Sequence, residues 1–392
     1  SVSIKVTADP PSWDDLSSAI DTLHKGTEDN ETPQAPQLTL YRDTNGWCPF
    51  CERVWVAIRA KGIPYRESLI SLQDKPEWYK ELVPTTLVPA ILLHPTTTTE
   101  EDDTTTTEPT KPKNKRTLIW ESADILQALD DAFPSTPRLL HPDNPDFTSA
   151  MTEAEELVTA GFSYIFGGRN ASLTEEDVSN KRTAFLDALD TLDSSLAAQT
   201  TTTETTFRLG NDFTAVDAVL IPVLERWRFQ LPLTHSIDIL HNRPHLQKWF
   251  DTVDSYAPYA DRVAGDEYSW TSVTSVFQQY FADTEDPKVK EVMQRADAAA
   301  EGLTASFTTA ASRIEEGGTG ASTARLEAAA KLVANHPAVI RDCTSETPAK
   351  SQTDLVRASD VDAADVVLRY VVSILLSEEG GGAMGTMAEA PL

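Results

Sequence analysis

The sequence predicts an α+β protein, in which an α/β domain is followed by an all-α domain and an extra helical tail. Apolar residues alternate between strand and helix spacing up to about residue 135, and follow a helical period from about residue 150 onward. The length of 392 residues suits more than one domain with a substantial core. A Cys-x-x-Cys sequence also stands between a strand-like run and an amphipathic helix.

Composition and charge narrow the class of protein. The net charge of −28 repels phosphate backbones and anionic lipid, so we expect no nucleic-acid partner and no membrane partner. No apolar run approaches the roughly 20 residues of a membrane-spanning helix. Three cysteines are too few for a secreted disulfide framework. With Ser1 first and no apolar signal segment, we expect a soluble intracellular protein, in a plastid rather than the cytoplasm.

The N-terminal half is expected to hold an arm and the α/β domain. Residues 1–36 are acidic and contain four prolines, and we interpret them as an arm with one short helix. Residues 37–135 follow the order βαβ-α-ββα. Strands are expected at 38–41, 65–71, 88–93 and 118–120, and helices at 49–61, at 76–82 and from 122. The threonine-rich, charged residues 94–116 cannot bury apolar surface and are predicted to be an exposed hairpin insertion.

The C-terminal half is expected to be helical. Residues 150–283 form the predicted all-α domain, with main helices at 154–164, 180–196, 216–229 and 245–256. Thr214 and Asp217 form a capping box that opens the third of these helices, a structural role. Residues 285–392 are predicted to be a helical extension, with one helix from Pro287, one at about 323–335 and one carrying apolar residues at 366–375.

The Cys48-Pro49-Phe50-Cys51 sequence is the strongest functional signal. A strand, a Cys-x-x-Cys turn and a helix form the layout of a thioredoxin-like redox site. Free N–H groups and the positive dipole at a helix start favour a thiolate at Cys48, and Cys51 lies one turn further on the same face. Arg53 either adds positive potential at the thiolate or is a solvated surface charge, and we expect the latter. A zinc site would need a second Cys or His pair at suitable spacing, so we expect no metal.

Several separate motifs resemble one family. The stretch CPFCERVWVAIRAKGIPYRESLISLQDKPEWYKELVPTTLVPAILL, and then LIWESADILQALDDAFP, resembles glutathione transferases, above all the cysteine-dependent omega, lambda and dehydroascorbate reductase classes. The helical half adds FRLGNDFTAVDAVLIPVL and HNRPHLQKWFD. The resemblance covers about residues 37–283, and neither the arm nor the tail has a counterpart in it. It implies that residues 37–135 bind glutathione and that residues 150–283 bind the second substrate.

The resemblance also implies roles for single residues. Cys48 would be the catalytic thiol, which forms a mixed disulfide with glutathione as co-substrate. Many omega-like members have one cysteine here, so either glutathione or Cys51 resolves that intermediate. Val88-Pro89 matches the family's cis-proline turn, whose backbone pairs with glutathione as an added strand would.

Further matched positions surround the ends of the glutathione molecule. Glu121 and Ser122 match the pair that binds the γ-glutamyl end, with Glu121 facing the ammonium group and Ser122 the carboxylate. Lys75, Leu72 and Phe50 match positions near the glycine end. Taken singly, a serine at this place is a helix cap and a lysine here is a solvated surface charge.

The predicted function is that of a glutathione-dependent thiol–disulfide oxidoreductase or transferase, with dehydroascorbate reduction as a candidate activity. Its second substrate is expected to be a small or disulfide-bearing molecule, and the family suggests a homodimer. The alternative is a catalytically weak or inactive binding subunit that reuses the fold and docks on a protein partner through residues 285–392.

Overall fold

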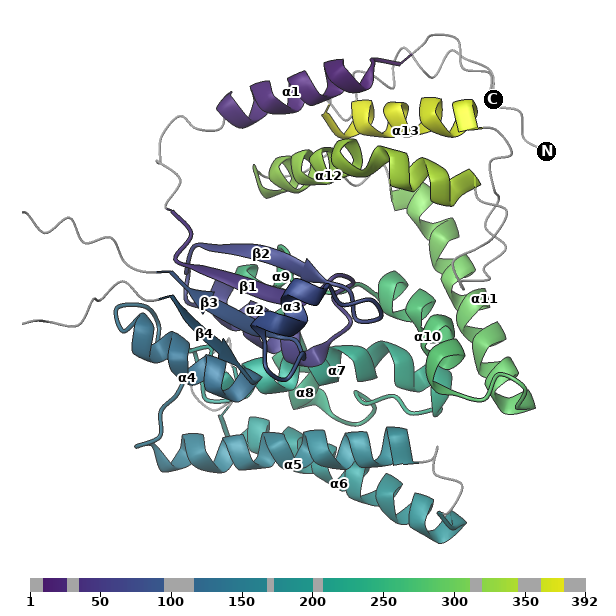
Figure 1. Ribbon diagram of the computed structural model, residues 1–392. Helices are drawn as coiled ribbons and strands as arrows, with labels where there is room; N and C mark the ends of the chain where they lie inside the picture. The colour runs from purple at the N-terminus through teal and green to yellow at the C-terminus, as the bar shows by residue number, and fades with distance from the viewer. Residues whose placement is uncertain are drawn as a thin grey trace, which may run out of the picture. The chain divides into compact units, whose positions relative to one another are not determined.

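The computed structural model describes most of the chain (Figure 1). The described residues are 10–26, 35–94, 116–167, 173–199, 207–310, 319–344 and 361–376. The predicted hairpin insertion at 94–116 therefore lies outside the described residues, except for its two ends. The chain divides into two compact units, the larger comprising Gln34–Ala300 and the smaller comprising Ser1–Pro33 and Glu301–Leu392.

A four-stranded sheet in the order β2-β1-β3-β4 organises the first part of the larger unit. Strand β1 pairs in parallel with β2 and antiparallel with β3, and β3 pairs antiparallel with β4. The elements in chain order are β1 (Leu38–Asp43), α2 (Pro49–Ala60), β2 (Tyr65–Ile70), α3 (Glu77–Leu82), β3 (Ala90–Leu93), β4 (Thr117–Trp120) and α4 (Ser122–Ala132). This order confirms the predicted thioredoxin-like fold.

The two faces of the sheet carry different side chains, because successive residues of a strand point to opposite sides. Leu38, Leu40 and Ile91 belong to the main core together with apolar residues of α2 and α4. Tyr41 and Ala90, from the other face, form a smaller core with residues of α3. Both faces of the sheet are therefore covered, which explains why the interior strand β3 is apolar throughout.

The second part of the larger unit is helical, as the sequence predicts. Its helices are α5 (Pro145–Gly167), α6 (Glu175–Gln199), α7 (Ala215–Thr234), α8 (Pro244–Asp254), α9 (Ala257–Ala260) and α10 (Glu267–Phe281). The four main helices predicted from apolar spacing are α5 to α8. Each of α5, α6 and α7 extends beyond its predicted bounds.

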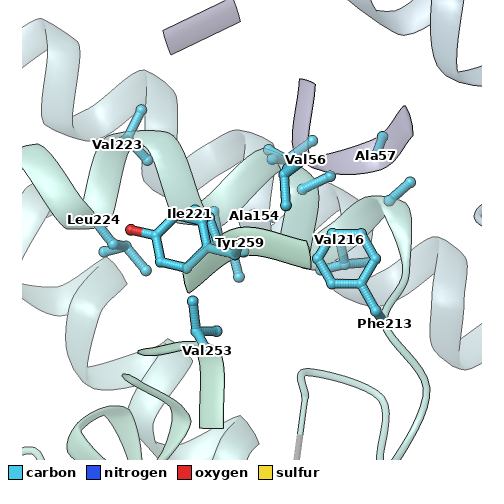
Figure 2. Close-up of a cluster of buried hydrophobic side chains, with 14 of the residues drawn as sticks. Val56, Ala57, Ala154, Phe213, Val216, Ile221, Val223, Leu224, Val253 and Tyr259 are labelled. Carbon is cyan, nitrogen blue, oxygen red and sulfur yellow. The ribbon is translucent and has the colours of Figure 1, made fainter. Parts of the chain in front are cut away.

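Helix α2 packs directly on α7, and this contact joins the two parts of the larger unit. Val56 and Ala57 of α2 are fully buried in one cluster with Val216 of α7 and Phe213 just before it (Figure 2). Burial of each such aliphatic side chain contributes about 1.5–3 kcal/mol. The helix that begins next to Cys48 is thus held from behind by the helical part of the chain.

The smaller unit brings both ends of the described chain together. Helices α1 (Trp13–Gly26), α12 (Thr319–Thr344) and α13 (Val361–Leu376) pack on one another (Figure 1), with Leu16, Ala329 and Val372 in the shared core. The arm and the tail therefore contribute helices to the same unit. Helix α11 (Pro287–Ala310) begins at Pro287, as predicted, and crosses the boundary between the units. None of the described helices is long and apolar enough to cross a membrane.

The capping box predicted at the start of α7 is present and fully buried. The Oδ2 atom of Asp217 accepts hydrogen bonds from the backbone N–H and the hydroxyl of Thr214, each at 3.1 Å. Its Oδ1 atom accepts from the backbone N–H of Arg208 at 2.8 Å and from the indole N–H of Trp249 at 3.0 Å. One carboxylate thus ties the start of α7 to two other parts of the helical region.

We expect Asp217→Ala to lower the free energy of unfolding by about 2–4 kcal/mol, because the helix cap is lost and buried N–H donors lose their acceptor. Urea unfolding followed by circular dichroism measures the loss. Asp177→Ala is the matched control, since Asp177 makes the same box with Thr174 at an exposed helix start. It should cost distinctly less, and equal losses in the two variants would show that burial of the box is not what matters.

Candidate active site

The register of the sheet brings the predicted site segments to one edge. Asp43 and Ile70 are paired at the carboxyl ends of the parallel strands β1 and β2, so the loops leading to Cys48 and to Lys75 leave from the same edge. Ala90 lies opposite Tyr41 and opposite Trp120. The antiparallel strands β3 and β4 therefore place Val88-Pro89 and Glu121-Ser122 at that edge too.

Cys48 is the N-cap residue of α2, with Pro49 in the first turn. The Cys48 side chain is half-buried, and its Sγ lies 3.9 Å from the backbone carbonyl oxygen of Val88. A hydrogen bond from the Cys51 thiol lowers the pKa of Cys48, and the backbone N–H groups of Cys51 and Phe50 act in the same direction against the effect of burial. Cys48 is therefore the thiol of the pair that ionises more readily.

Cys51 has the opposite character. It is 1% exposed, and burial raises its pKa well above the ordinary value, with the neighbouring Cys48 adding to the rise. Both cysteines are free thiols. The pair is thus polarised, with a reachable sulfur that is ready to lose its proton and a buried sulfur that keeps its proton and donates it in a hydrogen bond.

The Val88–Pro89 peptide bond is cis, in agreement with the resemblance to the cis-proline turn. Pro89 is buried, whereas Val88 is half-buried and lies just outside strand β3. The hydroxyl of Tyr79 donates a hydrogen bond of 2.7 Å to the carbonyl of Leu87, which anchors the turn on α3. The Val88 backbone therefore borders Cys48 at a position where an extended peptide can add to the sheet.

Glu121 and Ser122 lie at the start of α4. Ser122 is the first residue of the helix and is 8% exposed, while Glu121 is exposed and has a φ of 70°. A non-glycine residue at positive φ is strained, and such strain often marks a binding site. The hydroxyl of Ser122 accepts a hydrogen bond of 3.1 Å from Nη1 of Arg53.

Arg53 corrects the sequence analysis, which placed it at the surface. The side chain is half-buried, its Nε has no hydrogen-bond partner, and burial lowers its pKa. Arg53 lies about one turn after the start of α2, and its guanidinium contacts Ser122 at the start of α4. The positive charge of Arg53 therefore lies between the segment of Cys48 and the segment of Ser122, where an anionic group can interact with it.

The remaining predicted positions lie in two places at this edge. Phe50 is in the first turn of α2, and Leu72 and Lys75 are in the loop between β2 and α3. Phe50 and Leu72 are each 43% exposed, and Lys75 is half-buried. Exposed apolar side chains beside a reactive thiol are available to a ligand.

A buried charged cluster beneath the Cys48 loop was not found from the sequence. Arg226 of α7 donates to Oε2 of Glu52 at 2.6 Å and to the carbonyls of Gly46 and Trp47, each at 3.1 Å. Burial alone would lower the pKa of Arg226, but the Glu52 and Glu225 carboxylates raise it above its ordinary value. The Arg226 guanidinium therefore fixes the loop that ends at Cys48 from the helical side.

The two acidic members of this cluster differ in their contact with Arg226. Burial, together with the Glu52 carboxylate, raises the pKa of Glu225 well above its ordinary value. Glu52 is the closer counter-ion of Arg226, since its Oε2 lies 2.6 Å from the guanidinium and the Glu225 carboxylate lies 3.9 Å from it. The one signal in the sequence is a Glu-Arg pair inside an otherwise apolar helix, and it does not reveal the partner, since Glu52 is 174 residues away.

Asp43 is the second residue that the sequence analysis did not select. It ends β1, is fully buried, and its Oδ2 accepts a hydrogen bond of 2.6 Å from the backbone N–H of Trp47. A carboxylate oxygen of Asp43 and the sulfurs of Cys48 and Cys51 all lie within 4.8 Å of one another. Within the described part of the chain, this is the group of side chains best placed to hold a metal ion.

A pocket of about 300 Å³ lies at the other end of α2 and does not belong to this site. It is lined by Arg59, Gly62, Ile63, Tyr65, Ala257, Pro258 and Asp261. Helix α2 has 12 residues and is therefore about 18 Å long, which separates this pocket from Cys48.

We expect Cys51→Ala to raise the pKa of Cys48, because the strongest stabilising hydrogen bond to its thiolate is lost. The rate of alkylation by iodoacetamide against pH, measured in a Cys343→Ser background, reports this pKa. The midpoint should move to higher pH in Cys51→Ala and stay close to wild type in Cys51→Ser, whose hydroxyl still donates. An unchanged profile in Cys51→Ala would show that Cys51 does not stabilise the thiolate.

Comparisons with known proteins identify the family of the chain. Family models for the N-terminal and C-terminal domains of glutathione S-transferase match residues 47–132 and 123–252, which together span just over half of the chain. Glutathione S-transferase L2, chloroplastic, from Arabidopsis thaliana is 27% identical over 217 residues, which cover 55% of this chain and 62% of that protein. Glutathione S-transferase omega-1 from Rattus norvegicus is 27% identical over 232 residues, with coverages of 59% and 83%.

Among solved structures, dehydroascorbate reductase from Chlamydomonas reinhardtii is similar with a TM-score of 0.47 and 18% identity, covering 62% of this chain and 98% of that one. The matches to the N-terminal domain and then to the C-terminal domain identify residues 47–252 as a two-domain glutathione S-transferase architecture. The protein belongs to the glutathione transferase superfamily.

Proposed function

We propose that the protein is a glutathione-dependent thiol–disulfide oxidoreductase that works through a mixed disulfide at Cys48. The observation that carries this proposal is the polarised cysteine pair, with a half-buried Cys48 whose pKa is lowered and a buried Cys51 whose pKa is raised. Transferases that conjugate glutathione to electrophiles stabilise the glutathione thiolate with a hydroxyl group. A protein thiolate in that place favours formation of a disulfide instead.

Glutathione is expected to lie along the sheet edge where the predicted residues meet. Its peptide backbone would pair with Val88 beside the cis bond, with its sulfur close to Cys48. The γ-glutamyl carboxylate would bind at the amino end of α4 near Ser122, and Glu121 would face the ammonium group. Phe50, Leu72 and Lys75 would contact the glycine end. Arg53 adds a positive charge between Cys48 and Ser122.

The reaction would proceed by two disulfide exchanges. The Cys48 thiolate attacks the glutathione sulfur of a mixed disulfide, a new sulfur–sulfur bond forms, and the substrate leaves as a thiolate that takes up a proton. The thiolate of a second glutathione then attacks the bound glutathione sulfur, which releases oxidised glutathione and restores Cys48. We assign the second step to glutathione because Cys51 is buried and its high pKa makes it a poor attacking thiol.

Dehydroascorbate is a second substrate of the right kind, because two electrons from two glutathione molecules reduce it to ascorbate. The similarity to proteins named glutathione S-transferase L2 and glutathione S-transferase omega-1 supports the class of chemistry. The word chloroplastic in the name of one relative supports a plastid location. Glutathione transferases are often dimers, and a homodimer of the larger unit is compatible with the proposal.

The alternative function, a catalytically weak or inactive binding subunit, has one observation in its favour. Helix α13 exposes Val361, Val367 and Val371 by 55%, 48% and 40%, although it lies in a packed unit. Exposed apolar residues on one helix are a common feature of docking surfaces. A subunit of this kind would not depend on Cys48 for its role, so the assay described next separates the two functions.

The reduction of a glutathione mixed disulfide, coupled to glutathione reductase, should fall to the rate of free glutathione in Cys48→Ser, because the attacking thiolate is gone. Cys51→Ser is the matched control and should retain most of the turnover. Equal activity of the wild type and Cys48→Ser would contradict the mechanism. Full loss in Cys51→Ser would instead assign the second step to Cys51.

Ser122→Ala should raise the KM for glutathione by about tenfold or more, because a hydrogen bond to a charged group contributes about 1.5–3 kcal/mol. The turnover number at saturating glutathione should change little. Ser135→Ala, at an exposed position beyond the same helix, is the control and should leave KM unchanged. A normal KM in Ser122→Ala would place the γ-glutamyl end elsewhere.

A further inference from the structure

We propose that Asp43, Cys48 and Cys51 form a binding site for a thiophilic divalent cation, with Zn²⁺ as the best match. From the sequence alone, a zinc site would need a second Cys or His pair, and none at suitable spacing was found, so no metal was expected. The fold supplies a different third ligand, the carboxylate of Asp43 at the end of β1. Its oxygen and both sulfurs lie within 4.8 Å of one another.

The state of Asp43 is an independent reason to expect a cation. The residue is fully buried, and its Oδ1 has no hydrogen-bond partner, while Oδ2 accepts from the backbone N–H of Trp47. A buried carboxylate oxygen without a partner is costly, because it has lost water and gained nothing in exchange. A metal ion bound between Asp43 and the two sulfurs would give the Asp43 carboxylate a further partner.

The spacing fits a tetrahedral ion after a small adjustment. With Zn–S bonds of about 2.3 Å and Zn–O bonds of about 2.0–2.2 Å, ligand atoms in a tetrahedron are about 3.5–3.8 Å apart. The oxygen and sulfur atoms of this cluster lie up to 4.8 Å apart, which is about 1 Å more than the tetrahedral spacing. Binding of the ion would require rotation of the side chains of Cys48 and Cys51, which lie one turn apart at the start of α2.

The ligand types also select the ion. Two thiolates and one carboxylate suit Zn²⁺, whereas Mg²⁺ and Ca²⁺ require oxygen ligands. Both thiols must lose their protons when the ion binds. Three protein ligands leave a fourth position, and the half-exposed Cys48 is the side from which the ion and a water molecule or external thiol can reach it.

The metal ion itself offsets most of the charge of three anionic ligands in a buried place. The three ligands carry a charge of −3, and a divalent ion reduces it to −1. The remaining negative charge lies at the positive end of α2. The guanidinium of Arg226 is already paired with Glu52, and it holds the loop between Asp43 and Cys48 through the carbonyl groups of Gly46 and Trp47.

Metal binding and disulfide exchange would exclude each other at this site. A Cys48 sulfur bound to the ion is not free to attack a disulfide, and an oxidised Cys48 cannot be a ligand. The inference does not depend on glutathione as the co-substrate, because it concerns only the reduced protein. It adds a reversible, metal-dependent block of the reactive thiol.

Titration of the reduced full-length protein with Zn²⁺ under anaerobic conditions, in a Cys343→Ser background, tests the site. We expect one ion per chain, release of protons, and loss of iodoacetamide reactivity at Cys48 that is reversed by a chelator. Asp43→Asn should weaken binding by more than about tenfold, an effect that even the loss of an outer-shell partner can produce. Asp74→Asn, which removes an exposed carboxylate from the loop after β2, should bind as the wild type does.

X-ray absorption spectroscopy of the wild-type zinc complex covers the case in which Asp43→Asn does not fold. The proposal expects two sulfur neighbours and two oxygen or nitrogen neighbours around each ion. Absence of stoichiometric binding, an all-sulfur shell formed between two chains, or equal affinity in a folded Asp43→Asn protein would each overturn it.

Discussion

The hydrogen bond from the Cys51 thiol to Cys48 is the interaction on which the rest of the site depends. It divides two chemically identical residues by their pKa, because it lowers the pKa of Cys48 and adds to the rise that burial gives the pKa of Cys51. The division needs both the amino end of a helix, which supplies N–H groups and a positive dipole end, and a core that buries Cys51 almost completely. Helix α2 meets both conditions, because it begins at the sheet edge and packs on α7 along its apolar face.

The helical part of the larger unit helps to position the loop that leads to Cys48. Arg226 reaches from α7 to two carbonyl groups of the loop before Cys48, and Trp270 of α10 lies against the guanidinium with its ring centre 4.3 Å away. Phe277 of α10 also makes an edge contact with Trp47. The position of the reactive thiol is thus set by residues that come from both parts of the unit.

Local signals in the sequence were sufficient for most of the fold. Strand and helix periods located the sheet and the four main helices, the Thr214–Asp217 box marked the start of α7, and Cys48–Cys51 marked the redox turn. The cis bond before Pro89 followed from the family resemblance, because proline alone does not determine it. The four site segments meet at one edge because β1 and β2 run parallel, while β3 runs antiparallel to β1 and to β4.

Contacts between distant residues could not be predicted in the same way. In the sequence, Glu52 and Arg226 look like ordinary charged residues, because only the fold buries them together. Arg53 was expected at the surface because its partner Ser122 is likewise distant in the sequence. Asp43 is the last residue of β1 and follows Arg42, so its burial beside two sulfurs depends on packing around the strand end. The burial and the partners of such residues are set by tertiary structure, and a single sequence does not reveal them.

A crystal structure of Cys51→Ser treated with oxidised glutathione tests the central claim most directly. The account predicts a sulfur–sulfur bond between Cys48 and glutathione, with the peptide backbone of the tripeptide paired to Val88 and its γ-glutamyl end at the start of α4. An unmodified Cys48, or glutathione bound away from this sheet edge, would contradict it.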